Sequence, residues 1–131
     1  MYRILLVMEE RLFAQSLKRN FEENGLFECF IENKYDNVNL SATMHKVDIV
    51  LIGIVLKYES LKDRTDNISY KLDNILNSIK DSNYKKMILC SGEDNKSRKL
   101  VVKLKKSGLI GDFIFYDSSL EYMKSKLRAI A

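Results

Sequence analysis

Acidic and hydroxyl side chains follow directly after several short apolar runs of this sequence. Glu9 and Glu10 come after residues 3–8, and Ser91 ends the run that starts at Met87. Such polar side chains at the ends of apolar runs are candidates for a ligand site. They form one site only if the fold brings the ends of the runs together, so the elements that carry them must be identified.

Five short apolar runs predict five β-strands. The most informative run is VDIVLIGIV at residues 47–55, which is nearly continuous and rich in β-branched residues. Such a run is typical of a central parallel strand that is buried on both faces. The predicted strands are residues 3–8, 27–32, 47–55, 87–91 and 113–116.

Amphipathic segments lie between the apolar runs. Phe13, Leu17 and Phe21 recur at helical spacing with Leu12 beside them, which predicts a helix with one apolar face. Residues 57–67 have no apolar period and predict a long loop. The predicted helices are residues 11–24, 38–46 (a weak pattern), 68–79, 96–107 and 120–130.

The expected ends of these helices carry residues suited to capping. Gly25 and Gly108 stand where a left-handed C-terminal cap is wanted. Ser118 and Glu121 have the spacing of a capping box at the start of the last helix.

The alternation of five strands with five helices predicts an α/β fold of three layers, in which helices cover both faces of one parallel sheet. Right-handed crossovers favour the flavodoxin-like strand order 2-1-3-4-5. No repeat, low-complexity segment or proline-rich linker divides the chain. Residues 1–131 are therefore predicted to form a single domain.

Ligands bind at the carboxyl ends of the strands in a sheet of this order, so the residues placed there are candidates for a functional site. The residues placed there are Met8, Glu9 and Glu10 after the first strand, Gly53, Ile54 and Val55 after the third, Ser91, Gly92, Glu93 and Asp94 after the fourth, and Tyr116, Asp117 and Ser118 after the fifth. Of these, Glu10 and Asp94 are more simply explained as acids at helix starts, where they favour the helix dipole.

Four segments resemble the response-regulator receiver domain, in register and over nearly the whole chain. ILLVMEE resembles the first strand of that family, VDIVLIGI the third, ILCSG the fourth, and GDFIFYDSSLEYMKSKLRAI the fifth strand with the last helix. The resemblance implies a receiver fold and a role in two-component-type signal transduction.

The same resemblance implies that the family's phosphorylation chemistry is lost. Receivers hold Mg²⁺ with two acids after the first strand and with the phosphoacceptor Asp of the third strand. Here the matching positions are Met8, Glu9 and Gly53, of which only Glu9 is acidic, and a thioether is a poor ligand for Mg²⁺. Tyr116, a neutral phenol at pH 7, replaces the family's Lys, whereas Ser91 keeps the hydroxyl position.

We therefore predict a degenerate phosphorylation pocket with no catalytic residue, no bound metal and no cofactor, in a protein that is not an enzyme. The interval between Gly53 and Ser91 is also longer than in a typical receiver, by an insertion around residues 57–67. The insertion either covers the pocket or forms a contact surface, or it is a tolerated loop, since longer loops cost little closure entropy.

A stripe of lysines runs along the helix predicted at residues 96–107. Lys96, Lys99, Lys103 and Lys106 recur at i, i+3, i+7 and i+10. Receivers use this helix, the fifth strand and the last helix for dimers or partners, so the stripe together with Tyr116 is a candidate face for an acidic protein partner or a homodimer. The alternative is an ordinary solvated helix surface. The helix has no aromatic residue for base stacking, which argues against direct nucleic-acid binding.

The remaining reactive side chains suggest no chemistry. Cys29 and Cys90 lie within apolar runs and are predicted to be buried free thiols. His45, the only histidine, lies far from any strand's carboxyl end and is predicted to be at the surface or half-buried. No nucleotide-binding glycine motif is present.

The composition sets broad limits. The net charge of +4 favours acidic partners, no apolar stretch is long enough to span a bilayer, and no secretory signal is recognisable. We therefore predict a cytoplasmic protein without membrane contact.

The sequence as a whole predicts a receiver-like domain that is not phosphorylated at the usual site and that acts by binding a protein or a second copy of itself. It is either the regulatory part of a transcription regulator, with DNA contacted only through a C-terminal domain beyond Ala131, or a freestanding adaptor. The alternative is a flavodoxin-like domain that binds a small molecule in the degenerate pocket.

Overall fold

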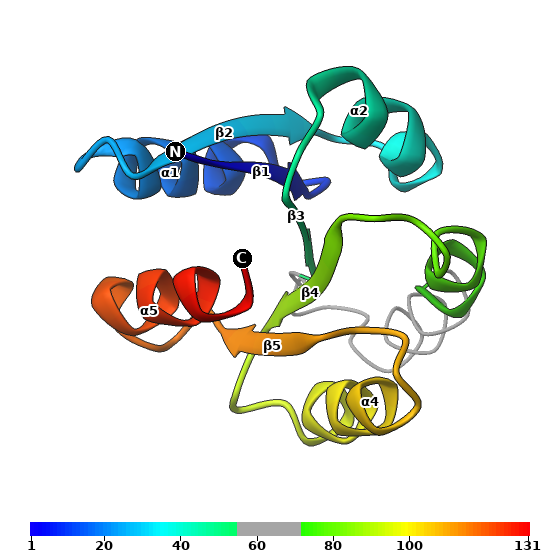
Figure 1. The fold of residues 1–131 in the computed structure, drawn as a ribbon. Helices are drawn as coiled ribbons and strands as arrows, with labels where there is room; N and C mark the ends of the chain where they lie inside the picture. Colours follow the sequence, from blue (N-terminus) through cyan, green and yellow to red (C-terminus); the bar gives the residue numbers. More distant parts are fainter. Residues whose placement is uncertain (55–71) are drawn as a thin grey trace.

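Five parallel strands form the centre of the fold, in the order β2-β1-β3-β4-β5 (Figure 1). The structure is a computed structural model and describes residues 1–54 and 72–131. The strands are β1 (Tyr2–Val7), β2 (Phe27–Glu32), β3 (Ile49–Gly53), β4 (Lys85–Cys90) and β5 (Asp112–Phe115). The predicted fold class and strand order are confirmed.

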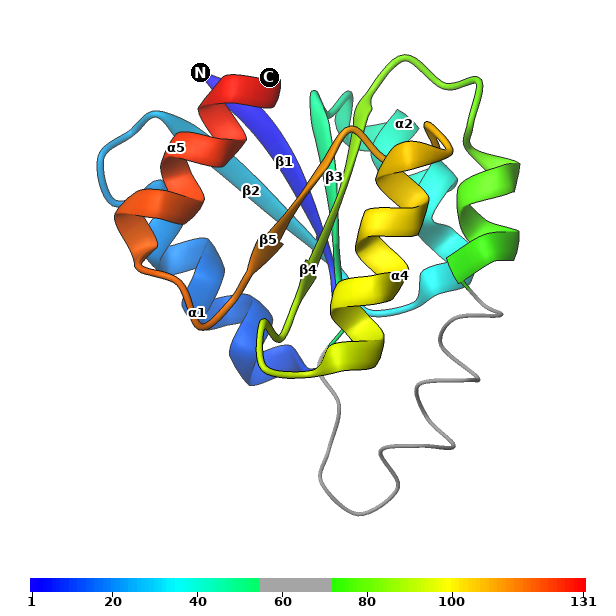
Figure 2. The same ribbon diagram turned by 90° about the horizontal axis from the view of Figure 1, so that it is seen from below.

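Helices cover both faces of this sheet (Figure 2). One face carries α1 (Arg11–Glu22) and α5 (Leu120–Ile130), and the other carries α2 (Val38–His45), the helical residues 72–78, and α4 (Asn95–Lys106). A short 3₁₀ helix, η1 (Tyr35–Asn37), precedes α2. The predicted loop at residues 57–67 and the first part of the helix predicted at 68–79 lie outside the described residues.

The central strand β3 is buried along its whole length, as its apolar sequence predicts. Its side chains alternate between the two faces: Ile49 and Leu51 join the core under α1 and α5, whereas Val50 and Ile52 join the core under α2 and α4. The strand begins two residues later than predicted because Val47 donates its N–H to Ala42 at the end of α2.

Helix α1 buries Ala14, Leu17 and Phe21. The predicted position of Leu12 on this face is wrong, since its side chain is 76% exposed. Leu12 lies five residues before Leu17, which turns it roughly 140° around the helix from the buried face. Gly25 has the predicted left-handed conformation, with φ of 71°.

The start of α5 differs from the predicted capping box. Its N-cap is Ser119, whose hydroxyl accepts the Tyr122 N–H at 3.1 Å. Ser118 belongs to the preceding turn and donates its own N–H to the Phe115 carbonyl. The third helical position is therefore Tyr122, which has no carboxylate to return the bond, and Glu121 remains as a first-turn acid that suits the helix dipole.

Among the described residues, no helix is both long and apolar enough to cross a membrane.

Lys46, which ends α2, offers a test of the local backbone. It is the only non-glycine residue with positive φ in the described part of the chain, at φ 52° and ψ 54°. This conformation is costly for any residue with a Cβ, so we expect Lys46→Gly to raise the free energy of unfolding by about 0.5 kcal/mol, after allowing for the more flexible unfolded chain. Urea denaturation measures the difference.

Lys34→Gly is the matched control, because Lys34 is also an exposed lysine next to a helix but has φ of −117°. Glycine relieves no backbone strain at position 34 and should lower the free energy of unfolding slightly. A Lys46→Gly protein no more stable than the unchanged chain would contradict this account.

Candidate functional site

The strand order brings the predicted site residues to one edge of the sheet. Met8, Gly53, Ser91 and Tyr116 lie at or directly after the carboxyl ends of β1, β3, β4 and β5. Backbone hydrogen bonds fix two of these ends: Met8 donates its N–H to the Glu32 carbonyl at 3.0 Å, and Tyr116 donates to the Cys90 carbonyl at 2.9 Å. The edge is therefore assembled as a receiver-like fold would assemble it.

The side chain of Met8 occupies the space directly beside Gly53. Met8 is 1% exposed, and a Cβ added to Gly53 would lie 2.7 Å from Met8 Cγ and 3.1 Å from Met8 Sδ. No side chain fits at position 53 without moving Met8. Met8 and Gly53, the two positions that depart from the receiver pattern, are thus packed against each other. The Met8 thioether fills the volume that a side chain at position 53 would take.

Two side chains that sequence reasoning missed bond to the backbone at this edge. Tyr35 donates its hydroxyl hydrogen to the Gly53 carbonyl at 2.9 Å, and Asn33 donates its amide to the Met8 carbonyl at 3.0 Å. Both come from the segment between β2 and α2, which starts at the same edge of the sheet. Their position after a predicted strand is the signal that would have found them. The outermost carbonyls of β1 and β3 are therefore already used within the protein.

Glu32 holds that segment in place. Its carboxylate accepts hydrogen bonds from the Ser41 hydroxyl and the Lys34 N–H. Burial raises the pKa of Glu32, but these bonds outweigh burial and leave the pKa below its ordinary value. The carboxylate therefore stays charged at neutral pH and stabilises the segment after β2 through these hydrogen bonds.

The acids near this edge are dispersed and mostly engaged. Glu9 is exposed, Glu10 caps α1 by accepting the Leu12 N–H, and Asp94 caps α4 by accepting the Lys96 N–H. The sequence interpretation of Glu10 and Asp94 as helix-start acids is confirmed. No three His, Cys, Asp or Glu residues gather as a metal site would require in the part of the chain that the structure describes.

Ser91 and the loop after it make local contacts. The Ser91 hydroxyl accepts the Glu93 N–H at 3.2 Å, and Asp117 accepts the Gly92 N–H at 3.0 Å. The second bond ties the loop after β4 to the loop after β5. The Ser91 hydroxyl thus stabilises a local turn, and the two loops are joined by a hydrogen bond.

Tyr116 is half-buried and turns toward α1. Its ring lies edge-on to that of Phe13, with the centroids 5.7 Å apart, and it packs with the core under α1 and α5. Phe115, one residue earlier, points to the opposite core, because neighbouring residues of a strand face opposite sides. The structure therefore does not bring Tyr116 together with the lysine stripe of α4, with which the sequence grouped it.

Helix α4 concentrates positive charge. Its 12 residues include six basic and no acidic ones. Without these six, the chain has 16 basic and 18 acidic residues, so α4 carries more than the whole positive excess. All four residues of the predicted stripe are exposed; they are Lys96, Lys99, Lys103 and Lys106.

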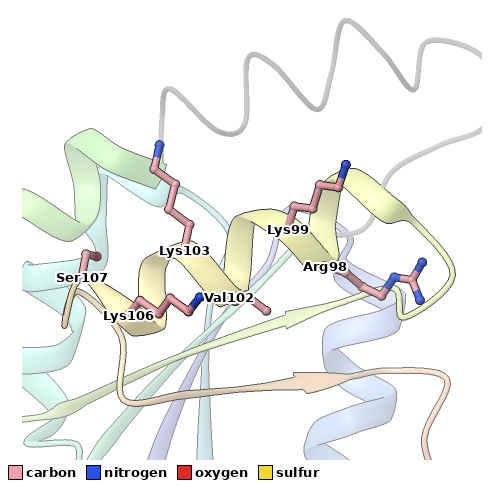
Figure 3. Close-up of a pocket in the computed structure, with 6 residues that line it drawn as sticks. All are labelled: Arg98, Lys99, Val102, Lys103, Lys106 and Ser107. Atoms are coloured by element: carbon pink, nitrogen blue, oxygen red, sulfur yellow. The ribbon is translucent and has the colours of Figure 1, made fainter.

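A shallow groove runs along the outer side of α4, and Figure 3 shows basic side chains around Val102 on it. Val102 is 42% exposed. The side chains that line the groove are Arg98, Lys99, Val102, Lys103, Lys106 and Ser107.

An ion-pair cluster at Asp112 continues this surface across β5. Asp112 accepts hydrogen bonds from Lys126 of α5 at 2.9 Å and from Lys105 of α4 at 3.3 Å. Both ammonium groups lie within 6 Å of the Phe113 ring centroid, at 5.7 and 5.8 Å, which is cation–π range. No sequence pattern indicates the cluster, because its members come from three separate elements.

The other reactive side chains lie as predicted. Cys29 and Cys90 are buried free thiols, and burial raises the pKa of each to about 12, so the reactive thiolate does not form at neutral pH. His45 is half-buried and stacks on Phe30 with 4.1 Å between the ring centroids.

Comparison with known proteins identifies the fold. No protein-family model matches the sequence, and none of the curated proteins matches it. A response regulator from Thermotoga maritima is similar, with a TM-score of 0.71 and 17% identity, over 99% of this chain and 97% of that chain. A two-component response regulator from Clostridium difficile has a TM-score of 0.68 and 18% identity, over 99% of this chain and 95% of that chain.

A third similar structure is a DNA-binding response regulator of the LuxR family from Staphylococcus aureus. Its TM-score is 0.69 at 13% identity, and the alignment covers 99% of this chain and 98% of that chain. At these identities the similarity establishes a shared fold. The chain has the flavodoxin-like receiver fold that the sequence resemblance implies.

The contact between Met8 and Gly53 predicts a specific coupling. Gly53→Ala should destabilise the protein by about 1–3 kcal/mol through overpacking, and Met8→Ala by about 2–5 kcal/mol through the cavity it leaves. In the double variant the new methyl group enters that cavity, so the combined loss should be smaller than the sum of the two by at least about 1 kcal/mol. Chemical denaturation of all four proteins measures this coupling.

Leu104→Ala combined with Gly53→Ala is the control pair. Leu104 is equally buried but belongs to the core under α4 and not to the core of Met8, so its loss and that of Gly53 should add. Additive losses for Met8 and Gly53 as well would mean that the two residues do not compete for one space.

The Asp112 cluster predicts a pH-dependent contribution to stability. Burial raises the pKa of Asp112, but hydrogen bonds from Lys126, the Phe113 N–H and Lys105 outweigh burial and lower the pKa. The carboxylate therefore stabilises the fold above the ordinary Asp pKa of about 4, and this stabilisation is lost as pH falls through the lowered folded value. Asp112→Asn should cost about 1.5 kcal/mol at pH 7, and the difference should shrink below about pH 4.

Thermal unfolding of both proteins across this pH range is the measurement. Lys103→Gln is the control, because Lys103 has no acidic partner among the described residues and should change stability by less than about 0.5 kcal/mol. A difference between the unchanged chain and Asp112→Asn that persists undiminished well below pH 4 would assign the cost to packing.

Proposed function

We propose that this chain is a receiver-like signalling domain that is not phosphorylated at the usual site and that acts by associating with another protein. The observation that carries the proposal is the packing of Met8 beside Gly53. It leaves position 53 without a carboxylate and leaves no room for one. An acyl phosphate therefore has no acceptor there.

The metal requirement of that chemistry is unmet for the same reason. Mg²⁺ needs several hard oxygen ligands in near-octahedral geometry. Glu9 is the only acid left at the matching positions, and the Gly53 carbonyl already accepts the Tyr35 hydroxyl. Tyr116 is packed on Phe13 and brings no positive charge to the edge. These contacts support a protein without cofactor and without catalytic activity.

Hydrogen bonds within the protein connect the segments at this edge of the sheet, which supports association through a preformed surface. Tyr35 and Asn33 pin the ends of β3 and β1, and Asp117 ties together the loops after β4 and β5. A bound phosphoryl group switches receivers by rearranging this edge, and here the protein's own side chains occupy it. Signalling would then depend on the abundance of the domain or of its partner.

Two settings fit such a domain. The first is the regulatory part of a transcription regulator, in which DNA is contacted through an additional C-terminal domain; one similar structure is a DNA-binding response regulator. The second is a freestanding adaptor formed by residues 1–131, with a cytoplasmic location in either setting. The mass of the native polypeptide in its own cells separates them: a value near 15.3 kDa supports the adaptor, and a much larger value supports the regulator.

Incubation with Mg²⁺ and a small phosphodonor, followed by intact mass spectrometry, tests the central claim. We expect no phosphorylated species, because position 53 offers no nucleophilic oxygen. A receiver domain that keeps its acceptor Asp, assayed in parallel, shows that the donor is active. Stoichiometric labelling of this chain would refute the proposal. Mg²⁺ should also leave the unfolding temperature unchanged, since a ligand bound only by the folded state raises it by mass action.

A further inference from the structure

We propose that a hollow at the amino edge of the sheet binds a small organic anion that carries a carboxylate or a phosphate ester. The hollow lies between the end of α2 and the segment before β4, at the edge where both chain ends lie (Figure 2). Its volume of about 520 Å³ is typical of ligand sites in proteins. Met8 and Gly53 lie at the opposite edge, so the inference does not rest on the proposed function and goes beyond it by naming an input.

The floor of the hollow is deep and apolar. It consists of Ala42, Val47 and Tyr84, which are 1%, 8% and 9% exposed. A small molecule can reach residues that are so little exposed, whereas a flat protein surface would contact only the rim above them. The shape of the hollow therefore favours a ligand of metabolite size over a protein segment.

Hydrogen bonds hold the two walls of the hollow in place. One wall is α2 with the turn after it, and the other is residues 82–85. The Tyr84 hydroxyl donates to Asn39 Oδ1 at 3.0 Å and so joins the two walls above the floor. The Lys86 ammonium supports the second wall by donating to the Ser82 carbonyl at 2.9 Å. Because the hollow is already formed, a ligand loses little affinity to ordering of the protein.

Two lysines without acidic partners line the hollow. Lys46 and Lys85 come from opposite walls, and neither forms an ion pair with a described residue. Asp48 also lines the hollow, but its carboxylate accepts the Arg3 N–H at 2.8 Å. Ala131 borders the hollow as well, and its carboxylate pairs with neither lysine. An anion bound between the two ammonium groups would supply their missing counter-charge.

The backbone conformation of Lys46 points to a function of its side chain. Lys46 is the only non-glycine residue with positive φ among the described residues, and such strain is concentrated at ligand sites. Glycine would be more stable at this position. A cation one residue earlier, in place of His45, would favour the helix dipole equally well without the strain. The fold therefore bears a cost for a lysine here, as expected where its ammonium group binds a ligand.

Neutral hydrogen-bonding groups complete the rim. Thr43 contributes an exposed hydroxyl from one wall, and Asn83 contributes an exposed amide from the other. A carboxylate or a phosphate ester has several acceptor oxygens, and charge-assisted hydrogen bonds to lysine are the stronger ones it can accept. Two ammonium groups with a hydroxyl and an amide between them match such an oxyanion.

Titration of the ¹⁵N-labelled chain with succinate and with glycerol 3-phosphate tests the inference. We expect the amide signals of residues 43–48 and 82–85 to shift, with a Kd on the order of 1 mM that rises as salt is added. Succinamide and glycerol, the neutral counterparts of the two anions, should leave these signals unchanged. Shifts with only one of the two anions support the inference and identify the oxyanion.

Two substitutions test the lysines of the hollow. Lys46→Gly and Lys85→Gln should each weaken binding by about threefold, as expected for exposed charges, and the double variant by about tenfold. Lys46→Gly is also the substitution that we expect to raise the free energy of unfolding. Weaker binding by a more stable protein cannot be attributed to a damaged fold, and a purely structural lysine would not produce it.

Lys34→Gly and Lys80→Gln are the matched controls, because both remove an exposed lysine that does not line the hollow. They should leave the Kd within about twofold of its original value. Equal losses in the controls would overturn the inference, as would shifts with the neutral compounds or an absence of shifts at the hollow with both anions. A chain that binds neither anion and also takes no phosphoryl label loses this inference and keeps the proposed function.

Discussion

The burial of β3 on both faces constrains everything else in this structure. A strand of Ile49, Val50, Leu51 and Ile52 leaves no polar face, so helices must cover both sides of the sheet and the connections must be crossovers. The same burial brings the end of β3 beside that of β1. There the same space is available to a side chain at position 53 or at position 8, and in this chain Met8 fills it.

The packing of Met8 beside Gly53 has chemical consequences beyond the missing carboxylate at position 53. Because the Met8 thioether fills the space beside Gly53, the polar groups around it need other partners. The segment after β2 supplies these partners. Tyr35 satisfies the Gly53 carbonyl and Asn33 the Met8 carbonyl, while Glu32 braces the segment through Ser41 and Lys34. Buried polar groups are costly when unpaired, so these internal hydrogen bonds stabilise the observed arrangement of the edge. The absence of a carboxylate at position 53 and the hydrogen bonds made by Tyr35 and Asn33 are therefore parts of one arrangement.

The architecture could be predicted from the sequence because it depends on local patterns. Strand β2 was predicted to the residue, and the turns at Gly25 and Gly108 followed from backbone preference. Two predictions were wrong where the pattern was compatible with two registers. Leu12 is apolar but does not lie on the buried face of its helix, and the N-cap of the last helix is Ser119 instead of Ser118. The positions of the site residues at the strand ends could be predicted, whereas the contacts between their side chains could not. The filling of position 53 by Met8 joins residues far apart in the chain, and Asp112 is shared by lysines of two different helices. Periodicity within one element cannot predict either contact.

Helix α4 has a charge asymmetry that packing does not require. The core needs Val101 and Leu104 on the inner side of α4, and it places no demand on the outer side beyond solubility, which scattered charges of both signs provide. Instead every charged residue of α4 is basic, in a chain whose remaining residues are slightly acidic overall. Concentrated charge of one sign gives little stability and some self-repulsion, but it raises the encounter rate with an oppositely charged surface and excludes like-charged ones. The Met8 contact and the buried side of α4 lie in different cores, so the packing beside Gly53 places no demand on the charge of α4.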